Sequence, residues 1–167
     1  YYKYGGGIML NKSETGVYYL NDETKFNGNY NNNFAKENLK SILDLRNDKE
    51  EAINYYLELL EENLKDYDLG EFDIVTSVPN QEQGYISEGM MKLLQRLSEN
   101  YDKLKFVKCL DREGNTINSC YDDLKDKNIL LFDFVVDKGT SLSACKRTLK
   151  AADANLIVCI ALQKTTI

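Results

Sequence analysis

The second half of the chain alternates apolar segments of strand length with segments whose apolar residues recur at helical spacing. The apolar segments, each typical of a strand, are residues 72–78, 104–109, 128–136 and 156–162. Between them lie two helical faces: Ile86, Met90, Leu93, Leu94 and Leu97, and then Leu142, Cys145, Leu149 and Ala152. Strands that alternate with helices need crossover connections, which produce a parallel sheet. This pattern predicts an α/β fold with a parallel sheet and helices on both faces.

The beginning of the chain is expected to add a small hairpin. Residues 1–33 are rich in Tyr, Gly and Asn, and they contain short apolar segments at 8–10 and 17–20. This hairpin is either a hood over a substrate or a plain sheet edge. Because the chain has 167 residues and a domain has roughly 150, we expect a single domain, 1–167, with 34–167 as its α/β core.

Two helices are expected between the hairpin and the alternating half. The apolar face of the first is Phe34, Leu39, Ile42 and Leu43, and that of the second is Ile53, Tyr56, Leu57, Leu60 and Leu64. Asn33 is a candidate N-cap for the first helix, and Asp48 with Glu51 predicts a variant capping box for the second. Further along, the polar segment 111–119 is expected to be a turn region.

The chain contains no histidine, which excludes Ser-His-Asp catalysis, Cys-His catalysis and His-ligated zinc within it. Its four cysteines form no C-x-x-C pair, which disfavours a Cys-rich zinc site. Cys145 and Cys159 lie in apolar patterns and are predicted to be small buried residues. Chemistry is therefore left to carboxylates, backbone amides, hydroxyls, Lys, Tyr or a bound metal.

Charge and hydropathy bear on partners and location. The 21 Lys and Arg residues and 27 Asp and Glu residues give a net charge of −6, which disfavours nucleic acid and anionic membranes as partners. The sequence has neither a signal-peptide pattern nor a long apolar run, so we expect a cytoplasmic protein without membrane contact. A homodimer, or a fused or partner protein domain, is compatible with the sequence.

The segment from Ile129 to Leu142 contains the strongest candidates for ligand-binding residues. An apolar strand leads into Asp133, and a short loop with Gly139, Thr140 and Ser141 opens the following helix. Ligands of open α/β sheets bind at the carboxyl ends of strands, and free amides at a helix N-terminus attract anions. This arrangement predicts a site for a phosphate monoester, with Asp133 facing a sugar diol or Mg²⁺. The alternative is a capped helix without a ligand.

Residues Phe132–Leu142, which read FDFVVDKGTSL, resemble the phosphoribosyl pyrophosphate (PRPP) motif of type I phosphoribosyltransferases. In that motif an apolar strand is followed by two acids, two apolar residues and a loop containing Gly and Thr. Weaker similarity to the ComF-like subfamily lies in Ile74–Pro79, Gln83–Tyr85 and Thr24–Gly28. The resemblance implies a type I phosphoribosyltransferase-like domain that binds PRPP or a nucleotide-like small molecule.

The resemblance also implies roles for individual residues. Asp133 matches the first acid, which binds the ribose hydroxyls directly or through Mg²⁺, and Asp133 and Asp137 are the candidate catalytic residues. The loop for the 5′-phosphate corresponds to Asp137, Lys138, Gly139, Thr140 and Ser141, and the pyrophosphate loop to Pro79, Asn80 and Gln81. Mg²⁺ is the cofactor implied for an active enzyme.

Two features depart from the family pattern. Phe134, which we predict to pack into the core, stands in place of the second acid, and no Arg or Lys lies between Phe72 and Met91. Departing pyrophosphate needs Mg²⁺ and cations to stabilise its charge. Two functions therefore stay open. One is binding of a 5-phosphoribosyl ligand with transfer to a base or an amine; the other is a catalytically degenerate module that senses a nucleotide or binds a protein.

Overall fold

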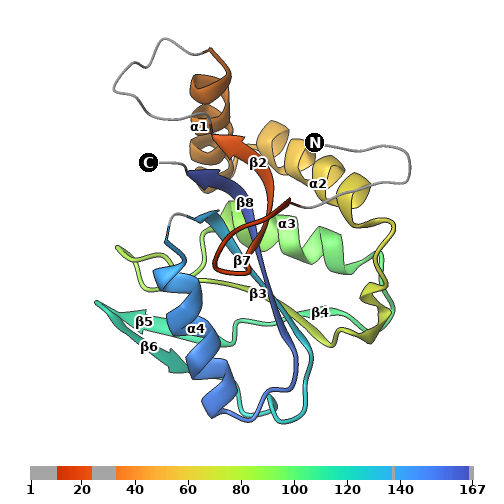
Figure 1. Ribbon diagram of the computed structural model, residues 1–167, viewed down its shortest axis with the longest axis vertical. Helices are drawn as coiled ribbons and strands as arrows, with labels where there is room; N and C mark the ends of the chain where they lie inside the picture. The colour runs from red at the N-terminus through yellow and green to blue at the C-terminus, as the bar shows by residue number, and fades with distance from the viewer. Residues whose placement is uncertain (1–10, 24–32, 137, 166–167) are drawn as a thin grey trace.

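A mostly parallel sheet forms the centre of the protein (Figure 1). The structure, a computed structural model, describes residues 11–23, 33–136 and 138–165. Within these ranges the sheet has six strands in the order β1-β2-β8-β7-β3-β4, of which only β1 and β2 pair antiparallel. The strands are β1 (Asn11–Lys12), β2 (Tyr18–Glu23), β3 (Ile74–Ser77), β4 (Lys105–Phe106), β7 (Ile129–Val136) and β8 (Ile157–Thr165).

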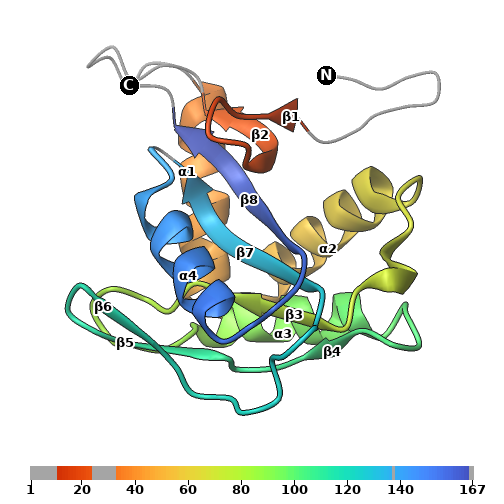
Figure 2. The same ribbon diagram turned by 60° about the horizontal axis from the view of Figure 1, so that its bottom comes forward.

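Helices cover both faces of this sheet, as Figures 1 and 2 show together. One face carries α1 (Asn33–Arg46), α2 (Glu50–Leu64) and α3 (Glu88–Ser98). The other carries α4 (Thr140–Ala151) and a separate hairpin of β5 (Leu110–Glu113) and β6 (Thr116–Ser119). The predicted α/β fold with helices on both faces is confirmed.

Strand β7 separates two apolar cores. Leu130 and Phe132 pack with the three helices of the first face, whereas Ile129 and Leu131 pack with α4, because successive strand side chains point to opposite faces. Burial on both faces explains why this strand is a continuous apolar run in the sequence. Asp133 directly follows these four fully buried residues in the strand.

The N-terminal hairpin forms an edge of the main sheet. Its turn is closed by the Ser13 N–H, which donates to the Val17 carbonyl at 2.7 Å, and β2 then pairs in parallel with β8. Of the two alternatives for this region, the described residues fit the plain sheet edge. Residues 8–10 and Thr24–Gly28 lie outside the described residues, and the division of the domain at residue 33 stays a prediction.

The buried face of α1 differs from the predicted one. Ile42 and Leu45 are buried, whereas Leu39 and Leu43 are 40% and 43% exposed. The inward side of the helix also carries the polar Ser41, whose Oγ lies 2.6 Å from the Tyr56 Oη on α2. Because this interface is partly polar, the apolar pattern alone placed the face wrongly.

The predicted capping box at the start of α2 is wrong. The N-cap residue is Lys49, and its side chain makes no bond to the helix. Asp48 adopts a φ of 63°, and its carboxylate pairs with the Lys92 Nζ of α3 at 2.8 Å. The predicted apolar face of α2 is confirmed, with Ile53, Tyr56, Leu60 and Leu64 buried.

The segment predicted as a turn region is the β5–β6 hairpin. Its strands are mostly exposed and polar, so no apolar run marks them in the sequence. Leu110 and Ile117 pack with the core beside α4, and the Thr148 Oγ1 donates to the Ile117 carbonyl at 3.3 Å. Tertiary contacts rather than strand periodicity therefore hold this hairpin in place.

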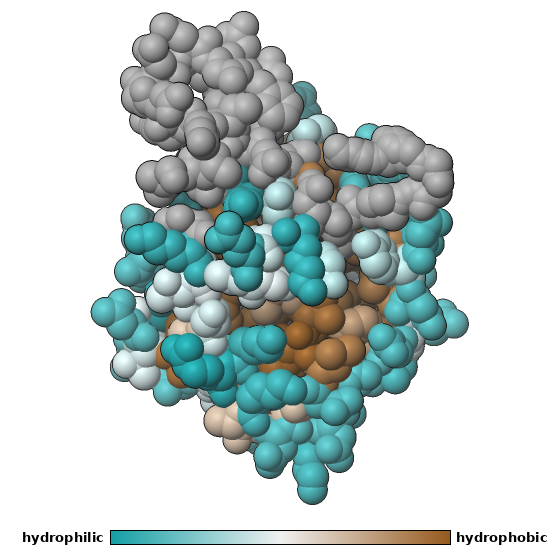
Figure 3. Space-filling view, viewed as in Figure 1, coloured by the Kyte–Doolittle hydropathy of each residue, from teal (hydrophilic) through white to brown (hydrophobic). Residues whose placement is uncertain are grey.

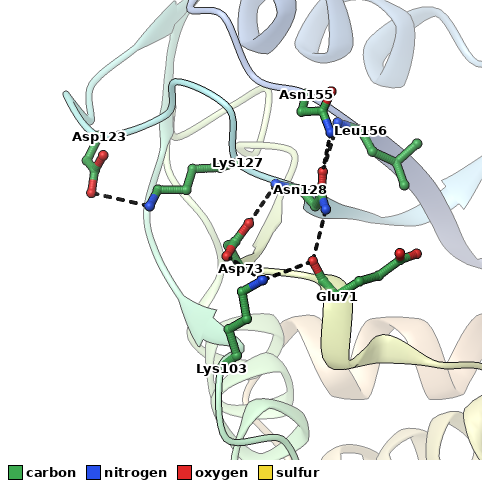
Figure 4. Close-up of polar contacts among 8 residues, drawn as sticks. All are labelled: Glu71, Asp73, Lys103, Asp123, Lys127, Asn128, Asn155 and Leu156. Carbon is green, nitrogen blue, oxygen red and sulfur yellow. Dashed lines mark hydrogen bonds and ion pairs between the residues drawn. The ribbon is translucent and has the colours of Figure 1, made fainter.

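Polar contacts close the sheet at the amino ends of β3, β7 and β8 (Figure 4). The backbone N–H of Asn128 donates to the Asp73 carboxylate, its side-chain amide donates to the Glu71 carbonyl, and its Oδ1 accepts from Asn155, each at 2.9 Å. Lys103 pairs with Asp73 at 3.1 Å. These hydrogen bonds and this ion pair thus hold the amino ends of the three strands together.

A mostly apolar cavity of about 270 Å³ lies among α2, β7, β8 and the short 3-10 helix η1 (Leu69–Glu71). Its lining includes Leu64, Leu130 and Val158, and Figure 3 shows apolar side chains gathered on one face of the molecule.

None of the helices in the described ranges has the length and apolarity needed to cross a membrane.

Candidate functional site

The candidate site lies where the neighbouring parallel strands β3 and β7 end. Their register pairs Ser77 with Phe132, so the segments that follow emerge side by side. Ligands of parallel α/β sheets bind at this kind of edge. A cavity of about 460 Å³ opens there. It is lined by Arg46, Val78, Pro79, Asn80, Gln81, Glu82, Ser87, Arg112, Asp133, Phe134 and Ser141.

A second cavity, of about 210 Å³, lies at the start of α4. It is lined by Asp133, Val135, Val136, Lys138, Gly139, Thr140, Ser141 and Leu142. Asp133 and Ser141 line both cavities, so they stand at the junction between them. The structure thus brings together every predicted site residue that it describes; Asp137 lies outside the described residues.

Asp133 is half-buried at this junction. Its Oδ1 accepts a hydrogen bond from the Phe134 N–H at 2.8 Å. Burial raises the pKa of Asp133 to about 7, against the opposing effects of that hydrogen bond and of the positive charges of Arg112 and Arg46. Near neutral pH the carboxyl group can therefore either accept or donate a hydrogen bond.

The first turn of α4 is open to the second cavity. Its N-cap is Gly139, in the left-handed region with a φ of 75°, and glycine has no side chain with which to cap the helix. A Cβ at Gly139 would lie 3.1 Å from the Thr15 Oγ1 of the β1–β2 turn, so a larger residue would be both strained and crowded. The space in front of this turn is large enough for a phosphate group, as the predicted anion site requires.

Several backbone amides in the segment before α3 and in the first turn of α3 donate hydrogen bonds to acceptors within the same segment. The Ser87 Oγ caps α3 by accepting from the Met90 N–H at 3.4 Å. The Asn80 Oδ1 accepts from the Glu82 N–H at 2.8 Å, and the Asn80 N–H donates to the Tyr85 carbonyl at 2.8 Å. The predicted pyrophosphate loop is therefore a pre-ordered wall of the cavity.

The β5–β6 hairpin packs directly on this loop. The Arg112 N–H donates to the Gly84 carbonyl at 3.2 Å. Gly84 has a φ of 80°, and a Cβ there would lie 2.5 Å from the Arg112 carbonyl oxygen. Glycine is thus required by both the backbone conformation and the close approach of the hairpin.

Two arginines reach the site from elements outside the sequence motifs. Arg112 on β5 donates from Nε to the Gly114 carbonyl at 2.9 Å and from Nη1 to the Pro79 carbonyl at 3.4 Å. Arg46, the last residue of α1, places its guanidinium carbon 5.1 Å from the centre of the Phe134 ring. The loop itself lacks cations, as the sequence shows, but the cavity does not. No local signal marks these residues, because tertiary packing brings them to the loop.

Phe134 both packs and faces the cavity. Its half-buried ring contacts the core beneath α1–α3, as predicted, and its exposed part lines the larger cavity beneath Arg46. The sequence prediction placed Phe134 in the core rather than at the cavity wall. At the carboxyl end of β7 both hold, because the helical layer stops beside the cavity.

Among the described residues, the donor set does not fit the implied Mg²⁺. Within the described residues, no group of three or more acidic or cysteine side chains is placed to hold a metal ion. The carboxylates that line the larger cavity come from Asp133 and Glu82, beside two guanidinium groups. Mg²⁺ prefers several oxygen ligands, and the arginines oppose a divalent cation. No step of the chemistry below is assigned to this metal.

No family model matches the chain, and no curated protein matches it either. Many solved structures resemble it in part, and they include the following three. Purine phosphoribosyltransferase from Pyrococcus horikoshii Ot3 shares 22% identity over 69% of this chain and 76% of its own, with a TM-score of 0.45. Phosphoribosylpyrophosphate synthetase from Mycobacterium smegmatis shares 16% over 68% of this chain and 33% of its own, with a TM-score of 0.44.

Hypoxanthine phosphoribosyltransferase from Staphylococcus aureus shares 16% identity over 74% of this chain and 64% of its own, with a TM-score of 0.39. The chain thus spans about a third of the synthetase that it resembles. At these TM-scores the likeness is partial. What establishes the α/β architecture is the parallel sheet of this chain, with helices on both of its faces.

Proposed function

We propose that this protein binds a 5-phosphoribosyl ligand such as PRPP, as a type I phosphoribosyltransferase-like protein of the ComF-like kind. One observation carries the proposal: Asp133 and Ser141 line two cavities at the carboxyl edge of the sheet, one bounded by each predicted loop. The ribose would lie at Asp133. The 5′-phosphate would lie at the start of α4, and the remaining phosphates beside Asn80 and Gln81.

Each part of this ligand meets a group of suitable chemistry. A phosphate at α4 meets the backbone amides of the first turn, the Ser141 hydroxyl and the positive end of the helix dipole. A ribose diol can donate to the Asp133 carboxylate, which is already oriented by the Phe134 N–H. Asp137 and Lys138 belong to the same proposed loop.

Transfer of the phosphoribosyl group to a base or an amine is the first form of this function. Pyrophosphate would leave the anomeric carbon through an oxocarbenium-like state, and the Asp133 carboxylate would stabilise the positive charge that develops. The second form is binding without turnover, as in a nucleotide sensor. Phe134 favours the second form, because it puts an aromatic ring at the cavity wall where the motif has an acid.

A turnover assay separates the two forms. Release of pyrophosphate from PRPP would be followed with a panel of bases and amines, with and without Mg²⁺. Sustained release supports transfer, whereas PRPP binding without release supports the sensing form. A cytoplasmic location and a homodimer or partner domain stay predictions that accompany either form.

Calorimetry with ribose 5-phosphate and PRPP tests the ligand itself. We expect Ser141→Ala to weaken both ligands by about tenfold, because a hydrogen bond to a charged phosphate is lost. The matched control is Ser143→Ala, since Ser143 is exposed on α4 and lines neither cavity. Absence of ribose 5-phosphate binding, or equal weakening by both variants, would contradict the proposal.

A further inference from the structure

The larger cavity contains two guanidinium groups that no motif accounts for. Arg112 is fixed by the carbonyls of Pro79 and Gly114, and Arg46 lies over the Phe134 ring. They come from β5 and α1, on opposite faces of the sheet, and they line one cavity with Asp133 and Asn80. Arginine provides a planar set of donors that matches phosphate oxygens.

The charge of this cavity favours an anion over a metal ion. Among its described lining residues, Arg46 and Arg112 stand against Asp133 and the rim residue Glu82. Burial raises the pKa of Asp133, so that its negative charge is incomplete near neutral pH. This described lining is therefore neutral to positive, and a divalent cation entering the cavity would face both guanidinium groups.

Phe134 connects the missing acid with one of these cations. The resemblance places a carboxylate at this position, where it would help to hold a metal ion. Here the position carries an aromatic ring, and the Arg46 guanidinium lies over its face at a cation–π distance. In place of a carboxylate that could attract Mg²⁺, this position has an aromatic ring that packs against the positively charged Arg46 guanidinium.

We propose that this cavity binds a phosphoanhydride, the diphosphate group of PRPP in the first instance, without Mg²⁺, and that Arg46 and Arg112 neutralise its charge. The proposal deepens the function proposed above and rests on it for the identity of the whole ligand. The diphosphate itself is recognised by the arginine pair, so inorganic pyrophosphate is a probe for the cavity alone.

Calorimetric titrations of the full chain with inorganic pyrophosphate and with PRPP test this proposal. Each would be run with EDTA and again with millimolar Mg²⁺. We expect pyrophosphate to bind in EDTA, with an affinity that Mg²⁺ lowers or leaves unchanged. We expect Arg46→Gln to weaken pyrophosphate and PRPP by about tenfold and to leave ribose 5-phosphate unchanged.

Lys146→Gln is the matched control, because it removes one positive charge from the exposed face of α4, outside both cavities. Arg112→Lys accompanies Arg112→Gln, since the Arg112 side chain also holds the hairpin; the Lys variant keeps the charge but loses the planar donors. Thermal melts of each variant would identify a folding defect. Both Arg112 variants are expected to weaken pyrophosphate, the Gln variant more.

Two results would overturn the proposal: pyrophosphate that binds only with Mg²⁺, or Arg46→Gln and Arg112→Lys variants that bind it as the parent does. Pyrophosphate binding in EDTA without any binding of ribose 5-phosphate would support the arginine site and refute the 5-phosphoribosyl ligand. Binding of ribose 5-phosphate without pyrophosphate would do the reverse.

Discussion

Helices α3 and α4 begin at the same edge of the sheet, yet their first turns are completed in different ways. The Ser87 hydroxyl caps α3, and Asn80 takes up the amide of Glu82 in the loop before it. At α4, the N-cap position is occupied by Gly139, which has no side chain that could cap the turn. The first loop is a wall held by its own side chains, whereas the second lacks an N-cap side chain and, in the function proposed above, offers its amides to a ligand. Under that proposal, two loops at equivalent places in the fold divide the tasks of shaping the cavity and binding the ligand.

The largest expected effect comes from Gly89, in the first turn of α3. A Cβ there would lie 1.7 Å from the Leu45 carbonyl oxygen, so Gly89→Ala would push α3 away from α1. We expect a loss of about 4 kcal/mol in the free energy of unfolding, measured by urea denaturation. Gly114→Ala is the control, because Gly114 has a φ of 59° and open space around it. Gly114→Ala should cost about 1 kcal/mol. An equal loss of stability in both variants would contradict the close approach of α3 to α1 at Gly89.

The next effect concerns Asp133, which lies between the two helix ends. Because its folded pKa is raised from 3.8 to about 7, the folded state holds a proton that the unfolded chain has already released. The parent should therefore lose stability as the pH rises from about 4 to about 7, by on the order of 3 kcal/mol. Asp133→Asn removes this loss, so it should melt higher than the parent at pH 8 and close to it at pH 4. A constant difference across that range would refute the raised pKa.

A smaller effect is expected from the α3 cap. Ser87→Ala removes the acceptor for the Met90 N–H and should cost about 1 kcal/mol of stability. Ser143→Ala, on the exposed side of α4, should change stability by less than about 0.5 kcal/mol. Chemical denaturation of both variants gives the comparison, and equal values would mean that α3 does not depend on its cap.

The smallest effect is a difference in amide hydrogen exchange between the two helix ends. With inorganic phosphate near twice its dissociation constant, exchange in the first turn of α4 should slow by about threefold, because bound phosphate engages these amides. The first turn of α3 should exchange at an unchanged rate. Mass spectrometry of peptides from the two helices provides the readout. Equal protection of both turns would show that phosphate does not bind preferentially at the first turn of α4.

Much of the fold could be predicted because its elements carry local patterns. The apolar run of β7 and the buried faces of α2 and α3 show their periodicity directly in the sequence, and the structure confirms them. The β5–β6 hairpin could not be predicted this way, since its residues are polar and mostly exposed. The inward face of α1 was misplaced because Ser41 joins a polar contact there.

The candidate site was only partly predictable for the same physical reason. Residues of the strand–loop–helix segment, such as Asp133 and Ser141, are close in sequence and could be recognised together. Arg46 and Arg112 reach the cavity through the packing of α1 and of the hairpin, which no local pattern encodes. Phe134 was assigned to the core, and its second role at the cavity wall depends on where the helical layer ends.

The pairing of β2 with β8 has a consequence for how the molecule is made. Tyr18 lies opposite Ile160, so β2 meets this partner only after about 140 further residues have left the ribosome. Until then, β1 is the only described strand with which β2 can pair, and the other edge of β2 stays open to unwanted strands. The β1–β2 turn, whose Thr15 touches the α4 cap, also waits for this step. The ligand pocket would therefore be completed only after β8 has been synthesised.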